Sequence, residues 1–188
     1  MDKKPLREIQ SVDRIVWITQ PQEQDDIVER ITNAFNIAKD KFHSTGNTEL
    51  LIQTAEAFGR GLFADHIKEK PVNWTAKEWL DNIVEEIMNP TGTGATFTRI
   101  TNTEIESVVF KSLLEEESTE PATASLFTYG MLRGLLLSAF PNGEVIMTTS
   151  TAQGAPMTGF VFKTEASDED RIERERVKTA FASIMKRA

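Results

Sequence analysis

The chain has 188 residues, of which 39% are hydrophobic and 27% charged, and its formal net charge is −8. This length and composition are typical of one globular domain with a buried core, and they exclude a disordered chain. An acidic chain repels phosphate backbones, so we expect no nucleic-acid binding without a basic patch. The basic residues gather only in two short terminal clusters: Lys3, Lys4 and Arg7, and Lys178, Lys186 and Arg187.

Cysteine is absent, which excludes disulfides, thiolate metal sites and thiol nucleophiles. The first ten residues contain no apolar stretch of the signal-peptide type. The longest apolar stretch, residues 131–140, is interrupted by Arg133 and is about half as long as a membrane span. We therefore expect a cytoplasmic protein without a membrane span.

Residues 1–22 are polar apart from the run 15–18, which we interpret as an added edge strand or as an arm that packs on a partner. Helical spacing of apolar residues begins at Asp25 and continues, after a break at residues 44–47, in a second helix. The apolar positions are Ile27, Ile31, Ala34, Phe35, Ala38 and Phe42, and then Leu51, Ala55, Phe58 and Leu62. A third helix is predicted after Thr75, because Thr75 and Glu78 have the spacing of a capping box.

Four strands are predicted at residues 95–100, 105–110, 145–149 and 157–163, the first two joined as a hairpin. A charge run at residues 115–117 should be solvated, and a long apolar helix should run from Pro121 to about Phe140 as the central buried helix. Ser167 should cap a last helix. The order α-α-α-β-β-α-β-β-α predicts an α+β fold, a four-stranded antiparallel sheet packed on helices. We divide it into an arm (1–22), a domain (23–165) and a C-terminal helix (166–188).

Three motifs resemble catalytic or metal-binding patterns, and each has a simpler interpretation. The only histidines, His43 and His66, lack the companions that a metal site needs, so we expect no metal and no cofactor. The sequence Gly-Thr-Gly-Ala at 92–95 precedes a strand rather than opening a helix, which favours a turn over a phosphate loop. The hydroxyl run 148–151 has no nucleophile elbow or triad context, so strand threonines explain it better.

Residues 55–62 (AEAFGRGL) form an early glycine-containing helical motif, and residues 129–136 (YGMLRGLL) form a central helical motif. The closing strands have Gly154 in their connector and Gly159 after it. Together these three segments resemble the early helix, the central helix and the terminal hairpin of the superfamily that joins 4-vinyl reductase domains with the small trafficking-complex (TRAPP) subunits. Many such domains place cysteines in that hairpin, and this chain has none, which puts the metal and lipid-attachment functions of the family in doubt.

The resemblance implies a homodimer and an apolar cavity between the central helix and the sheet. The aromatic and methionine residues suit a cavity wall as well as a plain core, and both interpretations stay open. The residues expected to line the cavity are Phe58, Leu62, Phe97, Phe110, Tyr129, Met131, Met147, Phe160 and Phe162. Four glycines, Gly59, Gly61, Gly130 and Gly134, are expected where another backbone approaches closely, from the sheet or from a second subunit.

Three functions remain open at this point. The first is a non-enzymatic domain that binds an apolar small molecule, or serves as a scaffold, as a homodimer with a helical, apolar contact. The second is an adaptor that docks a protein partner through the N-terminal arm and the C-terminal helix. The third, implied by the family name alone, is an accessory factor or reductase-like enzyme of tetrapyrrole metabolism.

Overall fold

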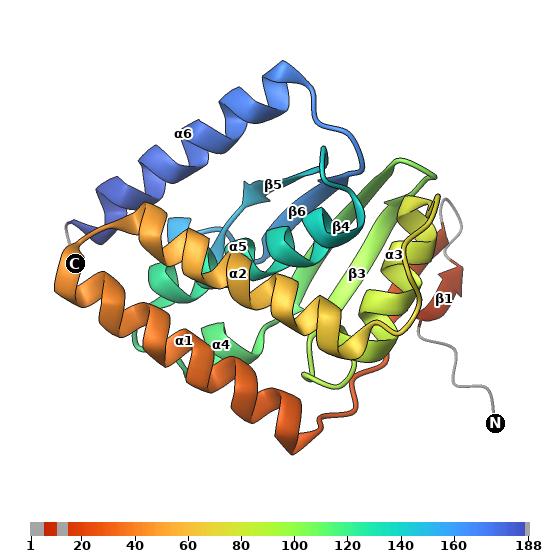
Figure 1. Ribbon diagram of the computed structural model, residues 1–188, viewed down its shortest axis with the longest axis horizontal. Helices are drawn as coiled ribbons and strands as arrows, with labels where there is room; N and C mark the ends of the chain where they lie inside the picture. The colour runs from red at the N-terminus through yellow and green to blue at the C-terminus, as the bar shows by residue number, and fades with distance from the viewer. Residues whose placement is uncertain (1–5, 11–14, 187–188) are drawn as a thin grey trace.

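The strands pair into one antiparallel sheet of six, in the order β1-β2-β3-β4-β6-β5. The computed structural model describes residues 6–10 and 15–186 (Figure 1). The strands are β1 (Leu6–Gln10), β2 (Ile15–Thr19), β3 (Gly94–Ile100), β4 (Glu104–Lys111), β5 (Glu144–Thr149) and β6 (Thr158–Lys163). The last four confirm the strands predicted from alternation, within one residue at each end.

The prediction of four strands was wrong, because the N-terminal segment adds two more. Strand β2 pairs with β3 through Trp17 opposite Phe97 and Ile18 opposite Thr96, and β1 forms the outer edge. The hydroxyl of Thr19 accepts a hydrogen bond from the backbone amide of Ala95 at 2.9 Å and so anchors this pairing. Strand β2 contains the apolar run 15–18, which we interpreted from the sequence as an added edge strand or an arm, but β1 takes the edge position and β2 lies between β1 and β3.

The helices are α1 (Asp25–Thr45), α2 (Thr48–His66), α3 (Ala76–Ile83), α4 (Leu113–Glu117), α5 (Pro121–Ala139) and α6 (Asp168–Met185). A π-helical turn, η1 (Val84–Met88), continues α3, and a 3₁₀ turn, η2 (Thr151–Gln153), joins β5 to β6. The predicted order of elements lacked the two N-terminal strands and α4. Helix α4 includes the charge run that was expected to be solvated. The capping box of Thr75 and Glu78 is present, as is one formed by Ser167 and Asp170.

Helix α5 is the buried centre of the fold, as its uniformly apolar sequence predicted, and α1 and α2 cover it (Figure 1). Helices α2 and α5 approach each other through glycines. A Cβ atom added at Gly59 would lie 2.1 Å from the carbonyl oxygen of Met131, and one at Gly134 would lie 2.1 Å from that of Glu56. A Cβ at Gly130 would lie 2.7 Å from the carbonyl oxygen of Ile52 on α2, whereas one at Gly61 would meet no atom within 4 Å. The close approach therefore joins two helices of one chain and does not involve Gly61.

Helix α6 packs beside β5 by a different kind of contact (Figure 1). Only Asp170 and Phe181 of this helix are buried. Three ion pairs attach it to the rest of the molecule: Lys163–Asp170 at 2.8 Å, Arg174–Glu144 at 3.1 Å and Lys178–Glu49 at 2.8 Å. Asp170 and Arg174, four residues apart on α6, therefore pair with residues of the sheet rather than with each other.

The side of the sheet away from α5 also carries apolar residues. Because side chains alternate along a strand and directly paired residues share a face, the strand registers identify these outward positions. We call them the outward sheet face: Ile9, Val16, Ile18, Val108, Phe110, Ile146 and Val161. Ile9 is 39% exposed and Phe110 is 52% exposed. Among the described helices, none has both the length and the apolar character to cross a membrane.

Candidate functional site

A groove with a volume of about 600 Å³ opens at the N-terminal end of α5. Four segments that are distant in sequence form its walls: the end of α1, the start of α5, the η2 turn and the end of α6. Its lining residues are Phe42, His43, Gly46, Thr119, Glu120, Pro121, Ala122, Thr123, Ala152, Ile184 and Met185. We call it the α5 groove. Its volume lies within the range of about 300–1,000 Å³ that is typical of small-molecule pockets.

Local sequence signals set the ends of the helices that form the α5 groove. Helix α1 ends because Gly46 adopts the left-handed conformation (φ 65°), and its amide donates to the carbonyl of Phe42 at 2.7 Å. Helix α5 begins with Pro121, whose fixed φ suits a first helical position. The amide of Glu120 donates to the hydroxyl of Ser118 at 2.9 Å, which holds the turn before the helix. The groove therefore lies between one helix end and one helix start.

The polar groups of the α5 groove converge on one carboxylate. Nε2 of His43 lies 2.9 Å and 3.1 Å from the two carboxylate oxygens of Glu120. The hydroxyl of Thr123 donates to the same carboxylate at 3.2 Å. The side chain of Glu120 keeps 31% of its surface exposed, and that of His43 keeps 55%. The groove thus combines apolar walls with an accessible hydrogen-bonded carboxylate.

A second carboxylate, Glu115, lies against the same end of α5. It accepts hydrogen bonds from the hydroxyls of Ser125 at 2.8 Å and Thr151 at 3.1 Å, with Thr158 at 3.5 Å. The expectation that this residue belongs to a solvated charge run was wrong, because hydroxyls of α5, η2 and β6 surround it. The buried Ser150 caps η2 by accepting from the amide of Ala152 at 3.2 Å, a structural role for the hydroxyl run.

The residues predicted to line a cavity are distributed through the core. Phe97, Tyr129, Phe160 and Leu62 are at most 1% exposed, and Phe162 packs on Trp79 with ring centroids 5.2 Å apart. The other residues predicted to line the cavity lie in different parts of the fold. Phe58 packs on Phe127, Met147 is buried, and Phe110 lies on the outward sheet face.

Met131 does line a cavity between α5, the η1 turn and β4, but its volume is only about 40 Å³. That space is several times what a single water molecule needs and far below a small-molecule pocket. Thr128 also lines it, and the hydroxyl of Thr128 is buried without a hydrogen-bond partner. The space found here between the central helix and the sheet is thus of a size suited to water, and Met131 alone of the residues expected to line an apolar cavity lines it.

A chain of buried ion pairs crosses from α2 through α5 to α6, and sequence reasoning missed it. Arg133 of α5 is hydrogen-bonded to Glu56 of α2 and, through Nε at 2.7 Å, to Glu144 of β5. Arg174 of α6 donates to the other oxygen of Glu144, whose side chain is 2% exposed. Burial opposes the charge of Arg133, but the hydrogen bond that Arg133 donates to Glu144 and the nearby negative charges of Glu144 and Glu56 together outweigh burial and raise the pKa of Arg133.

Arg133 was the feature of the sequence that could have indicated this network, because a charge inside an otherwise apolar helix requires a buried partner. The same helix carries Tyr129, whose hydroxyl is buried and has no hydrogen-bond partner. Burial raises the pKa of Tyr129, and the nearby Glu144 carboxylate raises it further. Glu144 and Tyr129 at the centre of the network are almost fully buried, so we assign the network to packing rather than to chemistry on a substrate.

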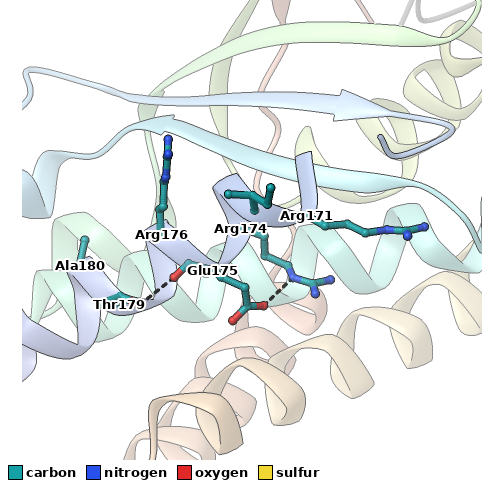
Figure 2. Close-up of a pocket in the computed structure, with 7 residues that line it drawn as sticks. Arg171, Arg174, Glu175, Arg176, Thr179 and Ala180 are labelled. Carbon is teal, nitrogen blue, oxygen red and sulfur yellow. Dashed lines mark hydrogen bonds and ion pairs between the residues drawn. The ribbon is translucent and has the colours of Figure 1, made fainter. Parts of the chain in front are cut away.

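An open concavity runs along α6 and contrasts with the α5 groove. Figure 2 shows its arginines: Arg174 bonded to Glu175 at 3.1 Å, and Arg171 and Arg176 extending away. All of its lining residues belong to α6, so no second element closes it. Such a surface cannot enclose a small molecule, and it carries no argument for a binding site.

The histidines lie far apart in the fold and have separate partners. His43 faces Glu120, and Nε2 of His66 lies 3.1 Å from the guanidinium of Arg30. Within residues 6–10 and 15–186, no group of three or more histidine, aspartate or glutamate side chains could hold a metal ion. Comparisons with protein-family models, with curated proteins and with solved structures find no match to this chain.

Proposed function

We propose that this protein binds a small, predominantly apolar molecule in the α5 groove. The observation that carries the proposal is the convergence of four segments on a concave space of about 600 Å³ with apolar walls. Phe42, Ala122, Ile184 and Met185 supply apolar surface, and the carboxylate of Glu120 supplies a point of orientation. Concave, mostly apolar sites with a few convergent polar groups are typical of small-molecule binding.

The function is binding rather than catalysis in this proposal. The polar groups of the groove are one carboxylate with its histidine and threonine partners, and the buried hydroxyl of Ser150 is engaged in capping a turn. The resemblance to the 4-vinyl reductase and TRAPP superfamily also stays a proposal. It is supported by the packing of its two helical motifs against each other, through Gly59 on α2 and Gly134 on α5.

The test uses 1-octanol as a probe, with binding measured by calorimetry and mapped by amide shifts in an isotope-labelled sample. We expect saturable shifts at Gly46, Ala122, Thr123 and Met185. Ala152→Trp should fill the groove and abolish binding. Ala180→Trp places the same side chain on the open α6 concavity and should leave binding unchanged. Shifts that gather instead around Thr128 and Met131 would assign the probe to the small cavity and overturn the proposal.

We further propose that the chain forms a homodimer, and that its contact is the outward sheet face. The helical contact expected from the sequence loses part of its basis, since the glycine strip of α2 packs on α5. The outward sheet face carries seven apolar residues, and its charges nearly balance: Arg7, Arg99 and Lys163 against Glu104 and Glu106. For a chain of net charge −8, this is a face on which two copies can meet without strong repulsion.

Sedimentation across a micromolar concentration range tests the dimer. Phe110→Lys should shift the chain to a monomer, because it places a charge within the apolar contact. Val72→Lys, at a loop residue that is 70% exposed, is the matched control and should leave assembly unchanged. A monomer at every concentration contradicts the dimer. If the Phe110→Lys variant is still a dimer, the contact lies on another surface.

A further inference from the structure

We propose that the α5 groove selects an amphiphile with a cationic head, such as a primary ammonium on an apolar chain. This inference rests on the proposed function and adds the chemical class of the ligand. It starts from the charges of the groove. Among its eleven lining residues there is one carboxylate, Glu120, and neither a lysine nor an arginine. The one other ionisable side chain of the groove is His43, which already pairs with Glu120, so a negatively charged head would have no unpaired cationic side chain there.

Hydrogen bonds hold the carboxylate of Glu120 at the wall of the groove. His43 contacts both of its oxygens and Thr123 donates to one of them, and about a third of the side-chain surface stays exposed. A carboxylate oxygen has two lone pairs, so Glu120 can accept further hydrogen bonds beyond those it makes here. Hydrogen bonds between an ammonium and a carboxylate are stronger than those between neutral groups.

The positive end of the α5 dipole lies at the groove and by itself would favour an anionic head over a cationic one. Two carboxylates already lie at that end: Glu120 in the groove and Glu115 bonded to Ser125 of the second turn of α5. Their charges complement the dipole, which is worth about half a charge at a helix terminus. A third negative charge there would be repelled by both carboxylates. The chain as a whole, at −8, also attracts cations.

The experiment compares three probes with one apolar chain and different heads: octylamine, 1-octanol and octanoate. Binding is measured by calorimetry at about pH 8, where histidine side chains are in general neutral. We expect octylamine to bind at least about threefold more tightly than 1-octanol, and 1-octanol more tightly than octanoate. The variant Glu120→Gln keeps the shape and removes the charge. It should abolish the advantage of octylamine over 1-octanol.

The matched control is Asp65→Asn, which removes one negative charge from an exposed residue outside the groove. It should preserve the order of the three probes, because the overall charge is not what selects the head. Equal binding of octylamine and 1-octanol, or tighter binding of octanoate, overturns the selectivity while the proposed function stands. An advantage of octylamine that survives Glu120→Gln, or octylamine shifts scattered outside the groove, overturns the role of Glu120. Failure of all three probes to bind overturns the proposed function itself.

Discussion

Helices α5 and α6 are of similar length, 19 and 18 residues, yet they attach to the fold by different physical means. Helix α5 is buried on nearly every side, and its backbone comes so close to α2 that glycine is required at three contacts. Helix α6 buries one aromatic ring and is attached by ion pairs to β5, β6 and α2. Salt does not weaken apolar burial by screening, whereas it does screen partly exposed charge pairs. We therefore expect α6 to detach more easily than α5.

The largest expected effect is on the apolar packing of α5. Leu135 is fully buried, and Leu135→Ala should lower the free energy of unfolding by about 2–5 kcal/mol, the range for truncating a buried leucine. Ile172 of α6 is 57% exposed, and Ile172→Ala should change stability by less than about 0.5 kcal/mol. Urea unfolding midpoints measure both. Equal losses at the two positions would remove the contrast between the helices.

The next effect concerns the close approach of α2 and α5. Gly134→Ala places a Cβ atom against a backbone carbonyl of α2, which cannot move aside as a side chain can, and should cost about 1–3 kcal/mol or more. Gly61→Ala is the control, because the space around Gly61 is open. Alanine favours a helix over glycine by about 0.5–1 kcal/mol, so this variant should gain stability. A loss of the same size at both glycines would contradict the packing.

A smaller and more local effect is expected at α6. Arg174→Met removes the hydrogen bond to Glu144 and should cost about 1–3 kcal/mol, the range for bonds to charged groups. Amide exchange in α6 should accelerate while that in α5 stays slow, and added salt should accelerate exchange in α6 of the unmodified chain. Arg176→Met is the control, since Arg176 is 73% exposed and pairs within its own helix. Uniform acceleration across the chain would show that α6 does not detach separately.

The smallest effect is on the titration of Tyr129, the single tyrosine of the chain. Its pKa is raised above the ordinary 10.0, first by burial and then by Glu144. The unfolded chain therefore loses this proton first, so stability is unaffected below pH 10.0 and falls as the pH rises beyond it. The phenolate absorbance of the folded protein should not appear at pH 10.0, although it does in denaturant. A normal titration of the folded protein would mean that Tyr129 reaches solvent.

Much of the fold could be predicted because its signals are local. The capping boxes at Thr75 and Ser167, the proline at the start of α5 and the alternation in β3 to β6 each depend on a few neighbouring residues. The glycines of α2 and α5 also carried information, since a glycine inside a helix indicates a close contact. The spacing of these glycines did not show which backbone they contact. Small residues allow the close approach of another helix of the same chain and of a second subunit equally well.

The site depended on contacts that no local pattern contains. The α5 groove brings Phe42 and His43 to Glu120, Ala152 and Met185, residues that are ordinary in their own segments. Likewise, Arg133 interrupts an apolar stretch in sequence, and only the fold supplies Glu56 and Glu144 as its partners. By itself the sequence determined composition class, most helices and four strands, because capping and periodicity act over a few residues. Only the tertiary structure decided the six-stranded sheet, the buried ion pairs and the groove, since each requires distant segments to meet.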